Sequence, residues 1–207
     1  MIELTNMTKT LNSRTIFSNF SLKVHSQEFI TIVGESGCGK TTLLNIMGLL
    51  DSFDKGKISV LNRLNPTGKE LQYLRRYHLG FLFQNYVLMN NKTVKENLKL
   101  STKFRESKTT ERDYTNVLEK VQLDETLLEK KIFQLSGGEQ QRVAMARVLL
   151  KPCSVIFADE PTGNLDTYNR DLIVSLFRQI QRDGKTIICV THDMDIAKQS
   201  DRIIKLS

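Results

Sequence analysis

Residues 29–41 decide the fold, and they read Phe29-Ile30-Thr31-Ile32-Val33-Gly34-Glu35-Ser36-Gly37-Cys38-Gly39-Lys40-Thr41. The first five are a mostly apolar, β-rich run, typical of a buried strand. Residues 34–41 fit the phosphate-binding pattern G-x-x-x-x-G-K-[ST], in which glycines let backbone N–H groups converge on phosphates. Apolar residues follow at positions 43, 46, 47 and 50. This spacing predicts a helix from Thr41 to Leu50 whose N-terminus points at the phosphates.

Strand and helix patterns alternate again near the end of the chain. The apolar run 155–158 predicts a strand that ends at Asp159-Glu160, and a helix is expected over residues 168–182. Residues 186–191 and 202–204 predict two further strands. Between these halves, residues 67–150 are mostly helical in pattern, interrupted at 79–83. We therefore predict an α/β fold with a mostly parallel sheet and an inserted helical subdomain.

Side chains with phosphate and metal chemistry follow the predicted strands. Lys40 is expected to contact the β- and γ-phosphates of a nucleotide, and Thr41 to ligate Mg²⁺. Two adjacent carboxylates leaving a buried strand are costly unless a cation or a reaction employs them. Asp159 would hold Mg²⁺, and Glu160 would orient or deprotonate the attacking water.

Gln84 and His192 are weaker candidates when each is taken alone. A glutamine after a strand is typical of a surface amide, and a lone histidine is usually structural. Beside a phosphate-binding loop, Gln84 is placed to contact Mg²⁺ or water, and His192 to reach the γ-phosphate.

Residues 135–142 look like a second phosphate-binding pattern, and they read Leu135-Ser136-Gly137-Gly138-Glu139-Gln140-Gln141-Arg142. One nucleotide rarely needs two such elements from one chain. The second pattern therefore suggests that two copies of the chain share two nucleotides.

Composition is that of an ordinary globular domain, with 207 residues of which 40% are hydrophobic and 26% charged. No apolar run approaches the ~20 residues of a membrane span, and the first residues show no secretory signal, so a cytosolic protein is expected. Cys38, Cys153 and Cys189 have no metal-binding spacing, which favours reduced, non-catalytic thiols.

The net charge of +7 is concentrated in the middle of the chain. Residues 55–131 carry sixteen lysines and arginines against nine acidic residues. A solvated face, an anionic membrane surface and nucleic acid are all compatible with this excess.

The ordered motifs resemble the nucleotide-binding domain of an ABC transporter over essentially the whole chain. The corresponding elements are a Walker A loop at 34–41, a Q-loop at Gln84, a signature at 135–142, a Walker B strand at 155–160, a D-loop at 164–166 and an H-loop at His192. The resemblance implies a P-loop NTPase fold with N-terminal antiparallel strands. It also implies one ABC ATPase domain over 1–207, with 1–84 and 151–207 as a RecA-like core and about 85–150 as the helical subdomain and signature.

The resemblance implies that ATP and Mg²⁺ bind between two chains packed head to tail as an ATP-dependent homodimer. Each ATP then lies between the Walker A loop of one chain and the signature of the other. The implied catalytic residues are Glu160, His192 and Gln84, and the implied metal ligands are Thr41, Gln84 and Asp159. The implied nucleotide-binding residues are Gly34, Glu35, Ser36, Gly37, Cys38, Gly39, Lys40, Thr41, Thr42, Ser136, Gly137, Gly138, Glu139 and Asp166.

Within that family, residues 80–85 and 161–166 are most similar to exporter ATPases of the lipoprotein-release and macrolide-export type, and 86–98 to Gram-positive bacteriocin or antimicrobial-peptide exporters. The implied function is ATP hydrolysis that drives export or membrane extraction of a peptide, lipoprotein or antimicrobial compound. The implied partner is a separate integral-membrane permease, with a membrane-fusion or extracytoplasmic protein as a further candidate, and no nucleic acid. The chain would lie peripherally on the cytoplasmic face of the cell membrane.

Two alternatives remain. A soluble ABC ATPase acting on DNA or ribosomes would suit the basic middle, but such proteins carry coiled coils or two cassettes in one chain. A nucleotide-gated dimerisation module without turnover is disfavoured by Glu160 and His192.

The chain departs from the family pattern in two places. Leu11 stands where relatives usually have an aromatic side chain that stacks on adenine, and Phe17 would substitute only if this loop folds unusually. The sequence also ends soon after the last predicted strand, so no regulatory C-terminal domain is expected.

Overall fold

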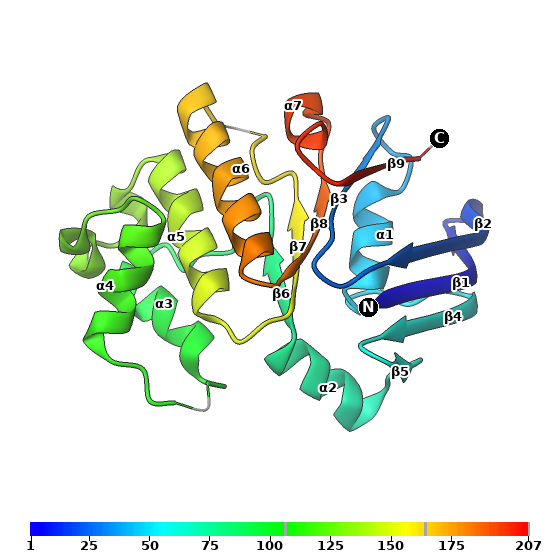
Figure 1. Ribbon diagram of the computed structural model, residues 1–207, viewed down its shortest axis with the longest axis horizontal. Helices are drawn as coiled ribbons and strands as arrows, with labels where there is room; N and C mark the ends of the chain where they lie inside the picture. The colour runs from blue at the N-terminus through cyan, green and yellow to red at the C-terminus, as the bar shows by residue number, and fades with distance from the viewer. Residues whose placement is uncertain (106, 164, 207) are drawn as a thin grey trace.

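The computed structural model describes residues 1–105, 107–163 and 165–206, and a five-stranded parallel sheet lies at its centre (Figure 1). The strands lie in the order β6-β7-β8-β3-β9. Their bounds are Phe29–Gly34 for β3, Leu79–Leu82 for β6, Val155–Asp159 for β7, Thr186–Val190 for β8 and Arg202–Leu206 for β9. Because all neighbouring pairs are parallel, the carboxyl ends of the strands meet at one edge of the sheet. That edge is where open α/β sheets bind ligands.

A smaller antiparallel sheet lies beside the central one, in the order β2-β1-β4-β5 (Figure 1). Its strands are β1 Ile2–Leu11, β2 Arg14–Val24, β4 Lys55–Val60 and β5 Arg63–Leu64. Asn12 and Ser13 join β1 to β2 with φ values of 47° and 64°. Positive φ at both central residues is the signature of a tight type I′ hairpin. This sheet is the N-terminal antiparallel part that the resemblance implied.

Helix α1, Lys40–Met47, fills the space between the two sheets. Its buried Leu43, Ile46 and Met47 share one apolar cluster with residues of both sheets. The predicted extension of this helix to Leu50 is wrong, because Gly48 caps the helix and Leu49 turns to a φ of 59°. Leu50 is 40% exposed and belongs to the loop that follows.

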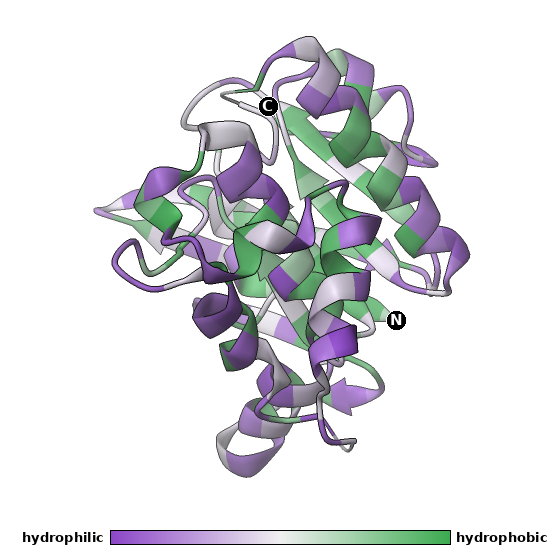
Figure 2. Cartoon of the chain, turned by 90° about the vertical axis from the view of Figure 1, so that its left-hand side faces the viewer, coloured by the Kyte–Doolittle hydropathy of each residue, from purple (hydrophilic) through white to green (hydrophobic). Residues whose placement is uncertain are grey.

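The other face of the central sheet is covered by α5, Gly137–Leu150, and α6, Thr167–Arg182. Neighbouring residues of β7 belong to the two different apolar clusters of the core, one on each face of the sheet. Ile156 packs with α5 and α6, whereas Phe157 packs with α1. This alternation follows from the two-residue period of a strand. Both faces of β7 are therefore buried, and Figure 2 shows the apolar residues gathered on the inner strands and inward helix faces.

The predicted helical stretch contains α2 Gly68–Tyr77, α3 Val94–Thr102, α4 Glu111–Lys120 and α5, with 3₁₀ turns η1 Glu125–Glu129 and η2 Ile132–Gln134. Helices α3, α4 and α5 pack together on the side of the molecule away from the antiparallel sheet (Figure 1). The predicted apolar face of α4 is buried, as Tyr114, Val117 and Leu118 show. The short α7, Met194–Ala197, precedes β9.

None of the helices among the described residues has the length and apolar content needed to cross a bilayer.

Candidate functional site

The predicted phosphate-binding loop joins β3 to α1, and its backbone conformation explains its glycines. Gly37 and Gly39 have φ values of 77° and 98°, in a backbone region that residues other than glycine rarely adopt. At Gly39 a Cβ would also lie 2.5 Å from Cγ2 of Ile16, so the close approach of β2 excludes any side chain there. The loop therefore exposes its backbone N–H groups at the start of α1.

Lys40 reaches back across this loop. Its ammonium donates to the carbonyl oxygens of Gly34 at 2.9 Å and Glu35 at 2.8 Å. An ammonium has three donors and a flexible stem, so it can exchange loop carbonyls for phosphate oxygens. The charge that would neutralise a phosphate is thus held at the mouth of the loop.

Thr41 and Asp159 bring the loop and β7 together. The Thr41 hydroxyl donates to Oδ1 of Asp159 at 3.1 Å. Burial raises the pKa of the Asp159 carboxyl above its usual range, and the neighbouring Glu160 raises it further, against the Thr41 hydrogen bond and the Lys40 charge, which lower it. A carboxylate held in such a place is stabilised by a bound cation.

Glu160 and His192 form a second pair beside the same loop. Nδ1 of His192 lies 2.9 Å from Oε2 of Glu160, and the backbone N–H of His192 points at the same oxygen at 3.3 Å. The Glu160 side chain is 15% exposed and the His192 side chain 70%. Glu160 itself has a φ of 44°, an unusual value for a non-glycine residue that turns the chain sharply at the end of β7.

Of these groups, Lys40, Thr41, Glu160 and His192 line one pocket of about 400 Å³ at the carboxyl edge of the sheet. Its lining residues are Leu11, Ile16, Ser36, Gly37, Gly39, Lys40, Thr41, Thr42, Gln84, Glu160 and His192. Gln84 also borders an adjoining pocket with Asp159. The structure therefore brings together the predicted loop, Gln84, Glu160 and His192, although they lie far apart in the sequence.

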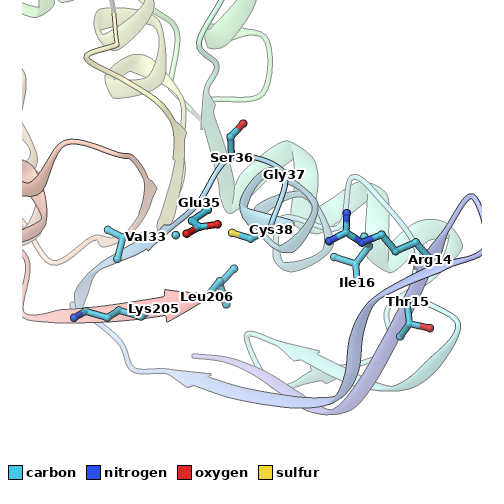
Figure 3. A pocket seen from close by; sticks show the side chains of 11 residues that line it. Arg14, Thr15, Ile16, Val33, Glu35, Ser36, Gly37, Cys38, Lys205 and Leu206 are labelled. Atoms are coloured by element: carbon cyan, nitrogen blue, oxygen red, sulfur yellow. The ribbon is translucent and has the colours of Figure 1, made fainter.

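A larger pocket of about 610 Å³ lies against another side of the same loop (Figure 3). Arg14, Glu35, Cys38 and Lys205 are among its lining residues. This larger pocket is not lined by Lys40, Asp159, Glu160 or His192. We therefore take the smaller pocket as the candidate site, because Lys40, Glu160 and His192 line it and Asp159 borders the pocket that adjoins it.

The predicted signature begins α5. Ser136 is the N-cap: its hydroxyl accepts from the Glu139 amide at 3.3 Å, and Glu139 accepts from the Ser136 amide at 2.8 Å. The hydrogen bond from the Ser136 amide is the main cause that lowers the pKa of the Glu139 carboxyl. Ser136 and Gly137 are exposed, and a Cβ on Gly137 would have no neighbour within 4 Å. The helix thus presents its N-terminal dipole at an open surface.

Among the described residues, the signature does not share the pocket of its own phosphate-binding loop, because none of Ser136, Gly137, Gly138 or Glu139 lines it. Asp166 does not line it either; it is the exposed N-cap of α6 and accepts from the Asn169 amide at 2.8 Å. Asn164, the first residue of the predicted D-loop, lies outside the described residues.

Asn169 is a residue that the sequence interpretation missed. It donates to Asp166 at 2.7 Å, accepts from the Arg142 guanidinium of α5, and packs against Gly138. The signature helix and the D-loop of one chain are therefore tied together. Only the Asp-x-x-Asn spacing at the start of a helix hinted at part of this contact.

Leu11 lines the pocket and is 39% exposed. Phe17 is only 6% exposed and packs on Phe20 with ring centroids 5.2 Å apart. Its ring also fills the space beside Gly39. Phe17 is thus a core residue, and the loop does not fold in the unusual way that would let it stack on a base.

The three cysteines are free thiols in the structure. None of them forms a disulfide, and Cys153 and Cys189 are buried. Burial raises the pKa of both thiols, which keeps them protonated and unreactive.

Comparison with known proteins matches residues 17–163 to the family model described as "ABC transporter". Among curated proteins, a macrolide export ATP-binding/permease protein of Yersinia pestis bv. Antiqua is 41% identical over 195 residues, covering 92% of this chain and 29% of that protein. A protein of the same description from Campylobacter jejuni is 38% identical over 215 residues, covering all of this chain and 33% of that protein. The chain thus spans about a third of these relatives.

Two solved structures match this chain over nearly the full length of both chains. The dimeric structure of MJ0796, a bacterial ABC transporter cassette, has 38% identity and a TM-score of 0.90, covering 100% of this chain and 94% of that one. A dimeric post-hydrolysis state of the same cassette, bound to ADP and Pi, has 36% identity and a TM-score of 0.91.

Proposed function

The chain belongs to the ABC transporter family, and from this membership we propose that it binds and hydrolyses ATP to drive export through a membrane permease. The observation that carries the proposal is the pair of contacts around one pocket. Thr41 bonds Asp159 at 3.1 Å, and His192 lies 2.9 Å from Glu160. Thr41, Glu160 and His192 line the pocket with the phosphate-binding loop, and Asp159 borders the adjoining pocket. Together the two pockets would supply a phosphate cradle, a metal site and a water-activating carboxylate.

Lys40 would bind the β- and γ-phosphates, with the backbone of residues 34–39 and Thr42 completing the cradle. The two glycines with positive φ, Gly37 and Gly39, allow that backbone to approach the phosphates closely. The N-terminus of α1 adds its dipole to the positive charge of Lys40.

Mg²⁺ fits the oxygens of Thr41 and Asp159. Their separation of 3.1 Å is close to the ~3 Å between neighbouring ligands of an octahedral ion with bonds of about 2.0–2.1 Å. Mg²⁺ typically takes only one or two protein carboxylates and completes its shell with phosphate and water. Gln84, which borders both pockets, would be a third ligand or would hold a water beside the ion.

Glu160 would orient or deprotonate the attacking water, and His192 would hold the γ-phosphate. The geometry supports this division, because His192 grips the same oxygen of Glu160 through both its ring and its amide. Bound Mg²⁺ would supply charge stabilisation of the phosphoryl group.

The active form would be a head-to-tail homodimer in which ATP joins two chains. Two observations support it: Ser136 and Gly137 are exposed at the start of α5, and none of the four signature residues is in the described lining of the chain's own pocket. A solved relative with 38% identity is dimeric. Ser136, Gly137, Gly138 and Glu139 would meet the γ-phosphate bound by the partner, and Asp166 would lie in the same interface. ATP binding and association would then be one equilibrium.

We further propose one ABC ATPase domain over residues 1–207, with 1–84 and 151–207 as the RecA-like core and 85–150 as the helical subdomain and signature. The packing of α3 and α4 on α5 supports this division. The permease would be a separate integral-membrane protein docked near Gln84 and residues 85–97, on the cytoplasmic face of the membrane. The curated relatives are named for macrolide export, and an antimicrobial compound, peptide or lipoprotein is the proposed cargo.

Phosphate release tests the proposal. The chain with Mg²⁺ and ATP should release phosphate in the steady state, and Glu160→Gln should abolish turnover while leaving ATP binding intact. Turnover that is the same in Glu160→Gln would show that another group activates the water.

A further inference from the structure

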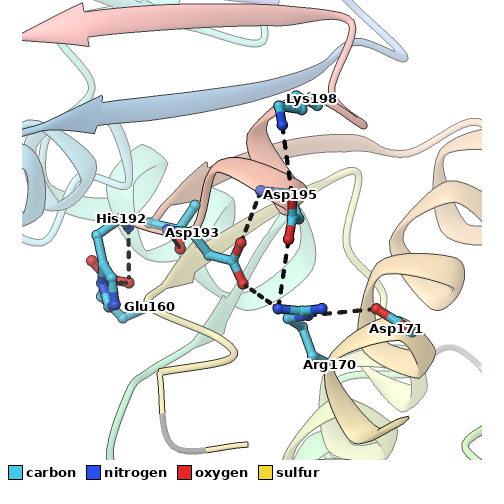
Figure 4. Close-up of polar contacts among 8 residues, drawn as sticks. Glu160, Arg170, Asp171, His192, Asp193, Asp195 and Lys198 are labelled. Carbon is cyan, nitrogen blue, oxygen red and sulfur yellow. Dashed lines mark hydrogen bonds and ion pairs between the residues drawn. The ribbon is translucent and has the colours of Figure 1, made fainter. Parts of the chain in front are cut away.

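The turn that carries His192 is held by its neighbour in the sequence, Asp193 (Figure 4). Oδ1 of Asp193 accepts from the Asp195 amide at 2.8 Å and so caps α7. The Asp193 amide donates to the buried Thr191 hydroxyl at 3.0 Å. The direction in which His192 leaves β8 therefore depends on where Asp193 sits.

Arg170 is the cation on the other side of that turn. It lies in the first turn of α6, with its side chain 28% exposed. Its Nη1 is 3.7 Å from Oδ2 of Asp193 and 3.7 Å from Oδ2 of Asp195. Asp193 thus has one oxygen on the cap of α7 and the other facing Arg170.

Among the described residues, Arg170 is the cation within ion-pair distance of Asp193. The cluster holds three carboxylates, on Asp171, Asp193 and Asp195, against two cations, Arg170 and Lys198 (Figure 4). Lys198 reaches only Asp195, at 3.7 Å, and its side chain is 70% exposed. Without Arg170, the partly buried Asp193 carboxylate would have no cation within ion-pair distance among the described residues, while Asp195 stays nearby with a like charge.

We propose that Arg170 is a positioning residue for hydrolysis, which holds the Asp193 turn so that His192 stays in contact with Glu160. The proposal rests on the function proposed above for Glu160 and His192. It follows from a chain of contacts: Arg170 fixes Asp193, Asp193 fixes the turn, and the His192 amide and ring both meet Oε2 of Glu160.

The same helical turn is also tied to the signature helix. Asn169, the residue before Arg170, accepts from Arg142 of α5 and bonds Asp166. The first turn of α6 therefore touches both the signature, which would serve the partner's ATP, and the His192 turn, which would serve the chain's own ATP. Arg170 is the part of this connection that contacts the turn carrying His192.

The test compares steady-state phosphate release by the wild-type chain, Arg170→Gln and Arg170→Lys. We expect Arg170→Gln to lower kcat about tenfold, since a catalytic group misplaced by about 1 Å can cost up to about 100-fold. KM should stay within about twofold, because the phosphate cradle is untouched. Arg170→Lys keeps a cation beside Asp193 and should recover most of the lost kcat.

Two further variants separate positioning from stability. Arg178→Gln removes the same charge from α6, where Arg178 pairs with Asp201 at 2.8 Å, and should leave kcat at the wild-type value. Asp193→Asn can still accept the hydrogen bond that caps α7 but loses its charge. It should lower kcat as Arg170→Gln does, and the double variant should show no additional loss.

The outcomes distinguish this inference from the function it rests on. If the wild type turns over, Glu160→Gln does not, and Arg170→Gln keeps the wild-type kcat, the positioning role is refuted. An equal fall in Arg178→Gln would also overturn it. If the wild type itself releases no phosphate, the proposed function fails. Amide hydrogen exchange in residues 191–197 then decides: faster exchange in Arg170→Gln than in Arg178→Gln supports positioning, and equal exchange contradicts it.

Discussion

Gly138 approaches Asn169 so closely that a Cβ on Gly138 would lie 2.9 Å from Nδ2 of the Asn169 side chain. Asn169 cannot easily move away, because Asp166 and Arg142 both hold its amide group. The neighbouring Gly137 has nothing within 4 Å of the same position. Two adjacent glycines of the signature thus have different reasons to be glycine: one for packing within the chain, the other for an open surface.

This difference predicts opposite effects of the same substitution. Gly138→Ala should lower the free energy of unfolding by about 1–3 kcal/mol through overpacking. Gly137→Ala should raise it by up to about 0.5–1 kcal/mol, because alanine loses less backbone freedom in a helix. Urea unfolding of the nucleotide-free chain measures both. Equal destabilisation by the two substitutions would show that Asn169 does not limit the space at Gly138.

Asp159 should make the chain less stable while making it active. Burial raises the pKa of its carboxyl, so the ionised form is disfavoured in the folded chain relative to the unfolded one. Asp159→Asn should therefore raise Tm at neutral pH without Mg²⁺, and should abolish Mg²⁺-dependent turnover.

The pH dependence gives this prediction a sign. The stability that the protonated Asp159 carries is fully present below its ordinary pKa of 3.8, and it is lost as the pH rises from there through the raised folded pKa. The Tm advantage of Asp159→Asn should accordingly shrink on acidification through that window. Thr162 is a buried residue in the turn that follows β7. Thr162→Val therefore serves as a control for changes of local packing. An advantage that grows on acidification would contradict the burial argument.

Leu11 in place of an aromatic residue should make the contact with the nucleotide base weak. An aromatic side chain stacking on a base contributes about 1–3 kcal/mol, and Leu11 offers only an aliphatic contact in the pocket. We predict modest discrimination between ATP and GTP in the wild type. Leu11→Tyr should tighten ATP binding about 5- to 30-fold, the equivalent of about 1–2 kcal/mol.

Fluorescent-nucleotide titration measures this effect, and Leu64→Tyr is the matched control. Leu64 is 59% exposed on β5 and does not line the pocket. A strong preference of the wild type for ATP, unchanged in Leu11→Tyr, would mean that another residue grips the base.

The sequence predicts the fold best where local pattern and burial agree. The strand over residues 29–33 and the helix over 168–182 are confirmed within one residue, as Phe29–Gly34 and Thr167–Arg182. Each element is followed by a residue pattern that ends it: a glycine-rich loop after the strand, and Gly184 with a φ of 87° after the helix. The family and fold class are confirmed by the match to ABC transporters. Leu50 was misplaced because its helical spacing continues past Gly48, where the backbone ends the helix.

The site residues divide in the same way. The motif residues of the phosphate-binding loop and β7 are recognisable because their chemistry requires them at fixed spacing. The roles of Asn169 and Arg170 are not recognisable in the sequence. Asn169 bonds Arg142, which lies 27 residues upstream in α5, and Arg170 pairs with Asp193, which lies beyond β8. Such contacts arise from the packing of α6 against two other elements, and no local pattern encodes it.

ATP-driven association of Ser136→Arg tests the shared-site account most directly. In a Glu160→Gln background, which should hold ATP without hydrolysing it, size-exclusion chromatography with ATP should show a dimer for the parent and for the control Ser175→Arg, an exposed serine of α6. Adding Ser136→Arg should abolish the dimer while ATP binding to the monomer stays nearly intact. A dimer that persists in Ser136→Arg, or a loss of ATP binding together with the dimer, would contradict the account.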